Sequence, residues 1–207
     1  MSNDQDDERL ASEWYDKKTA LMEKSLGPEH DMVMHAIIPY AVGGGLDLYY
    51  FPNGTSGTAI ATKELSEFLG EGSRNDEFDC YELVMFTRIP LDLEAAQDDS
   101  TEFGRIHASI NGILNCIARY SETATLNSGN TLEFPEGMEQ LGGRCLILFR
   151  YAQHELESGQ TFGLLAVMEV FRSEMNYSRE NGSAELISLL KQHGHYPFSD
   201  MDREPVV

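Results

Sequence analysis

Cysteine, basic residues and long apolar runs are all scarce in this 207-residue chain. The three cysteines, Cys80, Cys116 and Cys145, are odd in number, far apart and flanked by apolar residues. We therefore expect buried thiols and no disulfide framework. No apolar run approaches the ~18–20 residues that a membrane-spanning helix needs. The acidic start, MSNDQDDER, lacks the basic and apolar regions of a secretory signal, so we expect a cytoplasmic protein.

The charge of the chain is strongly one-sided. It has 35 acidic residues and 15 basic residues, for a net charge of −20. Nucleic-acid binding depends on Lys and Arg that neutralise phosphates, so we expect no nucleic-acid partner. An anionic membrane surface would be repelled for the same reason. A large negative field either steers a basic protein partner or simply keeps the chain soluble, and composition does not separate these two roles.

Apolar residues at helical spacing predict four helices, over residues 9–26, 105–120, 171–177 and 184–193. Gly27-Pro28 ends the first of them. The acidic residues 1–8 before it are predicted to be a disordered tail. In the second helix, Ile110, Leu114 and Ile117 form a stripe that we expect to pack against a sheet.

Seven further segments have the composition of strands. They are residues 31–38, 46–51, 58–62, 82–89, 127–134, 144–149 and 162–170. Residues 82–89 and 162–170 are nearly continuous apolar runs, which predicts strands covered on both faces. With the helices, these strands predict an α+β fold in which a mixed β-sheet is flanked by helices. No linker or repeat divides the chain, so residues 9–207 are expected to form one domain.

The residues that could carry chemistry form no recognisable active site. The Gly43-Gly44-Gly45 run precedes a strand and lacks a Walker-type Lys-Ser/Thr pair, which favours a hairpin loop over a phosphate-binding loop. His193 and His195 follow a helix, where a polar cap explains them, and no zinc-ligand spacing accompanies them. No G-x-S-x-G elbow is present. We therefore expect no enzyme activity, no cofactor and no metal.

Several segments, in order along the chain, carry a resemblance. They are the Leu-Ser pair at 65–66, FDCYELV at 78–84, ILNCIARY at 113–120, NSGNT at 127–131, FGLL at 162–165 and SDMDR at 199–203. In these segments the chain resembles the suppressor-of-fused (Sufu) domain family. The resemblance implies one Sufu-like domain that binds another protein without catalysis. Its expected role is that of an immunity protein neutralising a toxin, whose domain would be basic. The alternative is a regulatory or scaffold binder that sequesters a non-toxin partner, and the oligomeric state stays open.

The partner-binding surface is predicted on the acidic residues 71–99. Residues 64–102 contain twelve acidic residues, offset only by Arg74 and Arg88. A basic partner would relieve the self-repulsion of such a stretch. The contacts predicted from this charge are Asp76, Glu77, Asp79, Asp98 and Asp99. The alternative is a solvated acidic loop without a partner.

The resemblance also implies a position for the loop before residue 80 and a role for the closing segment. The loop before residue 80 is expected near the peptide-binding groove of the family, where a partner strand would add to the sheet. The closing segment is expected to be held on the domain rather than frayed. Asp200, Asp202 and Arg203 would hold it there, with Arg203 paired to a carboxylate.

Overall fold

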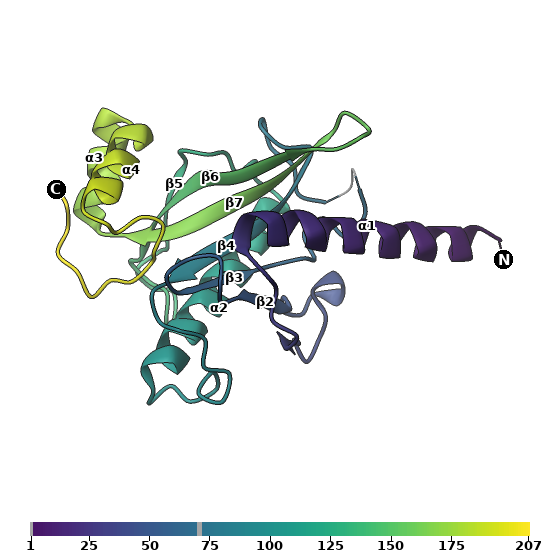
Figure 1. The fold of residues 1–207 in the computed structure, drawn as a ribbon. Helices are drawn as coiled ribbons and strands as arrows, with labels where there is room; N and C mark the ends of the chain where they lie inside the picture. The colour runs from purple at the N-terminus through teal and green to yellow at the C-terminus, as the bar shows by residue number, and fades with distance from the viewer. Residues whose placement is uncertain (1, 70–71) are drawn as a thin grey trace.

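A computed structural model describes residues 2–69 and 72–207 of the chain. Its helices are α1 (Ser2–Leu26), the 3-10 turn η1 (Tyr40–Val42), α2 (Glu102–Ser121), α3 (Arg172–Asn181) and α4 (Ser183–Gln192). Its strands are β1 (Val33–Met34), β2 (Leu48–Phe51), β3 (Thr58–Ala61), β4 (Cys80–Thr87), β5 (Thr131–Glu133), β6 (Cys145–Glu155) and β7 (Thr161–Val170). The strands described form one mixed sheet packed between helices (Figure 1). This is the α+β single domain that the sequence predicts.

The strands lie in the order β1-β2-β3-β4-β7-β6-β5. All neighbours are antiparallel except β4 and β7, which run parallel, with Cys80 opposite Phe162. Two antiparallel halves of the sheet therefore meet along one parallel pair. Every residue of β4 is buried and nearly all of β7 is buried, which confirms the two predicted interior strands.

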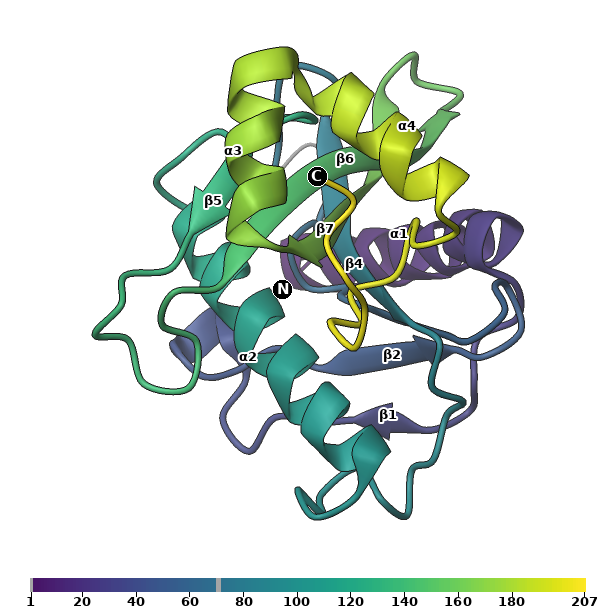
Figure 2. The same ribbon diagram turned by 90° about the vertical axis from the view of Figure 1, so that its left-hand side faces the viewer.

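Helices cover the two faces of the sheet unequally (Figure 2). On one face, side chains of α1, α3 and α4 share a buried core with the even-numbered side chains of β4, such as Val84 and Phe86. On the other face, α2 packs on the odd-numbered side chains, such as Leu83 and Met85. This alternation follows from the two-residue repeat of a strand. Ile110, Leu114 and Ile117 are buried on the α2 face, as predicted.

Helix α2 begins at a capped terminus. The Thr101 side chain accepts a hydrogen bond from the Gly104 N–H at 2.9 Å, which satisfies one of the unpaired donors at the helix start. At the start of β7, the ring of Phe78 lies directly on Gly163. A Cβ at Gly163 would come within 2.3 Å of that ring, so only glycine admits this packing.

Several predicted boundaries were wrong. Residues 2–8 are the first turns of α1 rather than a disordered tail, and acidic side chains are favourable at a helix N-terminus. Residues 31–38 contribute only the two-residue β1, because the chain leaves the sheet before Pro39. Residues 127–134 contribute only β5, while the strand predicted at 144–149 extends to Glu155. No helix among the described residues has the length and apolarity to cross a membrane.

Candidate functional site

The loop before β4 carries three of the five predicted contact residues. Asp76 and Asp79 are exposed, but both are hydrogen-bonded within the chain. The Asp76 carboxylate accepts from the Asn127 amide at 2.6 Å. The Asp79 carboxylate accepts from the Thr161 N–H at 2.7 Å and from its hydroxyl at 3.0 Å. These bonds fasten the loop to the segment before β5 and to the start of β7.

Glu77 is half-buried in the same loop. Its carboxylate accepts from the Ser128 N–H at 3.2 Å and lies 3.5 Å from the Arg150 guanidinium. Exposed Glu155, at the end of β6, lies opposite Thr161 in the sheet. Glu155 therefore lies at the same end of the sheet as the three predicted carboxylates of this loop. We call Asp76, Glu77, Asp79 and Glu155 the β4-entry cluster.

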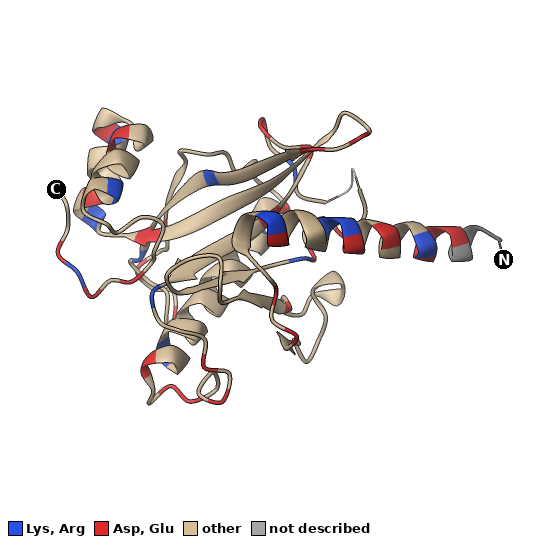
Figure 3. Cartoon of the chain, in the orientation of Figure 1, with Lys and Arg blue, Asp and Glu red and all other residues tan. Residues whose placement is uncertain are grey.

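Asp98 and Asp99 lie in the loop that leads into α2, where Figure 3 shows acidic residues along the ribbon. The Asp98 carboxylate accepts from the Ser100 hydroxyl at 2.6 Å and from its N–H at 2.9 Å. These two hydrogen bonds hold the pKa of Asp98 below its usual value. Asp99 is exposed.

The predicted contact residues thus fall into two groups. Asp76, Glu77 and Asp79 precede β4, and Asp98 and Asp99 follow it. The eight residues of β4 lie between the groups and span about 23 Å at 3.3 Å per residue. The two groups are close in sequence but lie at opposite ends of β4, so the sequence alone did not indicate the distance between them. Glu71, at the start of the predicted surface, lies outside the described residues.

In the described sheet, β4 has no free edge with which a partner strand could pair. Strand β4 already has β3 on one side and β7 on the other. The edges of the described sheet are β1 and β5. Strand β5 pairs with residues 145–147 of β6, and Leu148 of β6 then exchanges backbone hydrogen bonds with Gly129 and Asn130. Asp76 and Glu77 nevertheless contact the segment that leads into β5.

A buried polar network under α1 was not predicted. Glu82 lies on the α1 face of β4, and the Lys18 ammonium lies 3.1 Å from its carboxylate. The carboxylate also accepts from the hydroxyls of Thr62 and Ser66, both at 2.6 Å, and from the N–H groups of Leu65 and Ser66. Lys18 and Glu82 are almost completely buried. The network joins three elements: α1, β4 and the loop that follows β3. Its role is therefore structural.

The closing segment is held on the domain by Asp200 and Arg203, as predicted, whereas Asp202, the third residue predicted to hold it, is exposed. Arg203 donates two hydrogen bonds to the Glu174 carboxylate of α3, at 2.6 and 2.8 Å, and both side chains are buried. The Asp200 carboxylate accepts from the Thr87 hydroxyl at 2.5 Å and from the Arg88 N–H at 2.9 Å. Two carboxylate contacts therefore fix the segment to α3 and to the end of β4.

A cavity of about 540 Å³ lies between the end of β4, α2 and the closing segment. Met85 and Ile110 contribute apolar lining, and exposed Asp202 lies at its edge. The Arg144 guanidinium lies 2.9 Å from the Glu169 carboxylate in the same cavity. Burial raises the pKa of Glu169, and Arg144 opposes that effect. Arg144 and Glu169 therefore neutralise each other within the cavity.

The remaining candidate groups do not assemble a metal or nucleophile site. The rings of His193 and His195 stack 6.3 Å apart, and His193 is the C-terminal cap of α4. Across residues 2–69 and 72–207, no three His, Cys, Asp or Glu side chains are grouped as metal ligands would be. Cys80 and Cys145 are buried, as predicted, whereas Cys116 is half-buried. Burial raises the pKa of the Cys116 and Cys145 thiols, which disfavours the nucleophilic thiolate.

These observations define an α+β domain with one mixed sheet and acidic loops at its ends. Its architecture is that of suppressor of fused. The structure of the Sufu–Fu complex matches with a TM-score of 0.62 and 15% identity, over 95% of this chain and 92% of that chain. Drosophila Suppressor of Fused matches with a TM-score of 0.59 and 15% identity, over 93% of this chain and 50% of that chain.

A bacterial structure matches as well. A SUFU homolog from Neisseria gonorrhoeae FA 1090 gives a TM-score of 0.52 and 14% identity, over 93% of this chain and 97% of that chain. No family model and no curated protein sequence matches the chain. At these identities the likeness establishes the fold, and the predicted Sufu-like fold is confirmed.

Proposed function

We propose that this chain is a non-catalytic protein-binding domain that neutralises a toxin. The observation that carries the binding role is the Sufu fold over 95% of the chain, shared with a protein whose structure is a complex with a protein partner, Fu. Binding requires no catalytic group, which agrees with a cavity whose charged pair is self-neutralised and with thiols held in their unreactive form.

The charge supports a basic partner. The net charge of −20 and the two acidic loops at the ends of β4 would accelerate association with a cationic surface. Toxin domains that act on nucleic acids are themselves basic, because they must approach phosphates. An acidic protein that covers such a surface would block substrate access. A regulatory or scaffold binder that sequesters a non-toxin partner is the second candidate, and the same charge supports it.

The partner is identified by affinity purification from the native cell followed by mass spectrometry. Toxin neutralisation predicts a basic toxin domain, encoded beside this chain and inhibited by it in stoichiometric amounts. A partner without toxicity would instead establish the regulatory or scaffold role. Catalytic turnover by this chain of any compound in a broad activity screen would overturn the non-catalytic role.

Charge reversal in the β4-entry cluster tests the contact surface. Asp76→Lys with Glu155→Lys should slow association with the purified partner by about tenfold at low salt, and the difference should shrink as salt rises. Asp76→Lys removes the hydrogen bond from Asn127, but the Asp79 bonds to Thr161 stay and still fasten the loop to β7. Glu180→Lys with Glu185→Lys, on α3 and α4, makes the same charge change elsewhere and is the matched control. Equal slowing in both variants would show a general field effect and exclude this surface.

A further inference from the structure

The segment between β1 and β2 exposes large aliphatic side chains. Ile37 is fully exposed, Val42 is 73% exposed and Ile38 is 58% exposed. Single exposed aliphatic residues are common on soluble proteins, but three within six residues form a patch, and apolar patches mark interaction sites. We call Ile37, Ile38 and Val42 the apolar tip.

The apolar tip is held rigidly. The Arg119 guanidinium, from the last turn of α2, donates to the carbonyls of Tyr40 and Gly44 at 2.8 and 2.7 Å. The same guanidinium stacks 3.8 Å from the Tyr40 ring. Gly44 packs so closely on the turn that a Cβ there would lie 1.8 Å from the Ile38 carbonyl oxygen. A preorganised apolar surface loses little conformational entropy on binding, so its burial contributes fully to affinity.

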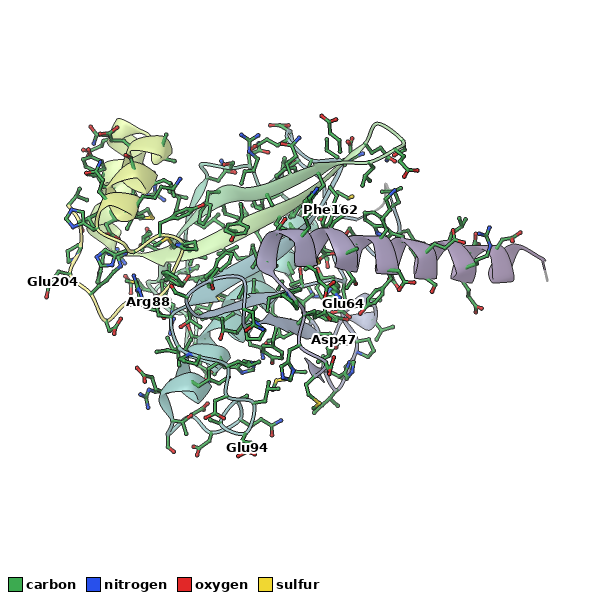
Figure 4. The ribbon with its side chains drawn as sticks, in the orientation of Figure 1. Asp47, Glu64, Arg88, Glu94, Phe162 and Glu204 are labelled. Carbon is green, nitrogen blue, oxygen red and sulfur yellow. The ribbon has the colours of Figure 1, made fainter. Side chains whose placement is uncertain are left out.

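An acidic hollow lies beside the apolar tip. It has a volume of about 520 Å³, and Tyr40, Glu64, Glu67 and Glu122 are among the residues that line it. The Tyr40 hydroxyl donates to Glu122 at 2.7 Å, so one residue joins the tip to the hollow. Glu64 accepts from the Asp47 N–H at 2.6 Å, and these two residues lie close together below α1 in Figure 4. Burial raises the pKa of Glu64, a cost that a cation in the hollow would relieve.

We infer that the apolar tip and the acidic hollow together bind a protein segment that carries an apolar side chain beside a lysine or arginine. The apolar side chain would cover Ile37 and Ile38, and the cationic group would enter the hollow between Glu64 and Glu67. Glu122 already pairs with Arg119 at 2.7 Å, so its charge is compensated within the chain. The charge of the surface selects this occupant: a second copy of the chain would bring another acidic hollow and a net charge of −20. This inference rests on the proposed protein-binding function and names a surface for it.

A short synthetic peptide of alternating leucine and lysine, labelled with fluorescein, is the probe. Its binding to the full chain is measured by fluorescence anisotropy, with serine-for-leucine and glutamate-for-lysine peptides as chemical controls. Replacing Ile37 and Ile38 by Ser should weaken binding about tenfold without changing the charge. Leu10→Ser is the matched control, because Leu10 is an exposed aliphatic residue on α1, outside this surface. Glu64→Gln with Glu67→Gln should weaken binding and reduce its salt dependence.

Amide chemical shifts of the labelled chain locate the bound peptide, and the expected changes are at residues 36–44 and 64–67. The inference is overturned if the wild-type chain does not bind the peptide, or if the shifts map to the β4-entry cluster. It is also overturned if the Ile37→Ser, Ile38→Ser variant binds the peptide as tightly as the Leu10→Ser control. Self-association that the Ile37→Ser, Ile38→Ser variant abolishes would make a second copy the occupant and would also overturn it. In each of these cases a purified native partner that still binds the chain leaves the proposed function standing.

Discussion

Glu82 places a carboxylate in the centre of the fold, where an isolated charge would be strongly unfavourable. Five donor groups surround it: the Lys18 ammonium, two hydroxyls and two backbone N–H groups. The Lys18 ammonium is itself satisfied by the carbonyl oxygens of Lys63 and Ser66. Each charge is therefore stabilised by the other and by these hydrogen bonds, and the pair links α1 to β4.

Removing one partner of this pair should be far more harmful than neutralising both. Lys18→Met should lower the free energy of unfolding by about 3–5 kcal/mol, because Glu82 is left charged and buried. Lys18→Met with Glu82→Gln should lose less than Lys18→Met alone, since no unpaired charge is left buried, even though the amide NH2 replaces one oxygen that accepts a backbone N–H. Urea denaturation measures both values. A double variant as unstable as the single variant would show that packing of the lysine stem, and not charge, is decisive.

At the scale of elements, the closing segment is tied to α3 through Glu174. Burial alone would raise the pKa of Glu174, but hydrogen bonds from Arg203 and from the N–H groups of Val206 and Phe171 hold it below its usual value. A carboxyl with a lowered pKa in the folded state stabilises the protein above its unfolded pKa of about 4.3, and this stabilisation is lost as pH falls through the folded value.

Replacing Glu174 by Gln should therefore lower the free energy of unfolding at neutral pH, and the difference from wild type should shrink on acidification to about pH 3. Urea denaturation at several pH values measures this difference. Glu180→Gln, an exposed residue on the same helix, is the control and should show little effect at any pH. A difference that is constant with pH would assign the role of Glu174 to packing.

The elements that could be predicted have strong local patterns. Strand β7 is a nearly continuous apolar run, and α2 has an apolar stripe at helical spacing, so each is specified by its own residues. The Lys18–Glu82 pair lies 64 residues apart in the sequence, and a helical lysine is ordinarily exposed, so no local pattern reveals it. Ile37 and Ile38 have the composition of a strand, but they lie beyond β1 in a turn whose carbonyls at Tyr40 and Gly44 bind Arg119.

For the candidate site, the sequence could identify the carboxylates but not their arrangement. Charge counting selects Asp76, Glu77, Asp79, Asp98 and Asp99 as members of acidic loops, and their contact with a partner stays a prediction. Their division into two groups depends on the direction of β4 across the sheet, and Glu155 joins the first group only through the pairing of β6 with β7. Both are consequences of topology.

At the scale of the whole molecule, the net charge of −20 should weaken the folded state through self-repulsion. Raising NaCl from low salt to about 0.5 M should raise the Tm by a few degrees, because screening shortens the range of that repulsion. Glu180→Lys with Glu185→Lys brings the net charge to −20 + 4 = −16 and should show a smaller rise. A Tm that falls with NaCl would mean that stabilising ion pairs outweigh the repulsion.

The parallel pairing of β4 with β7 also governs the order of events on the ribosome. Strand β4 ends at Thr87, and its partner β7 ends at Val170, 170 − 87 = 83 residues later. At roughly 5–20 residues per second, synthesis of that interval takes roughly 4–17 seconds. During this time the nascent chain can complete β1 to β4 but leaves one side of β4 unpaired, and unpaired strand edges promote aggregation. Until β7 is synthesised, the unpaired edge of β4 is therefore the part of the nascent chain that we expect a chaperone to protect.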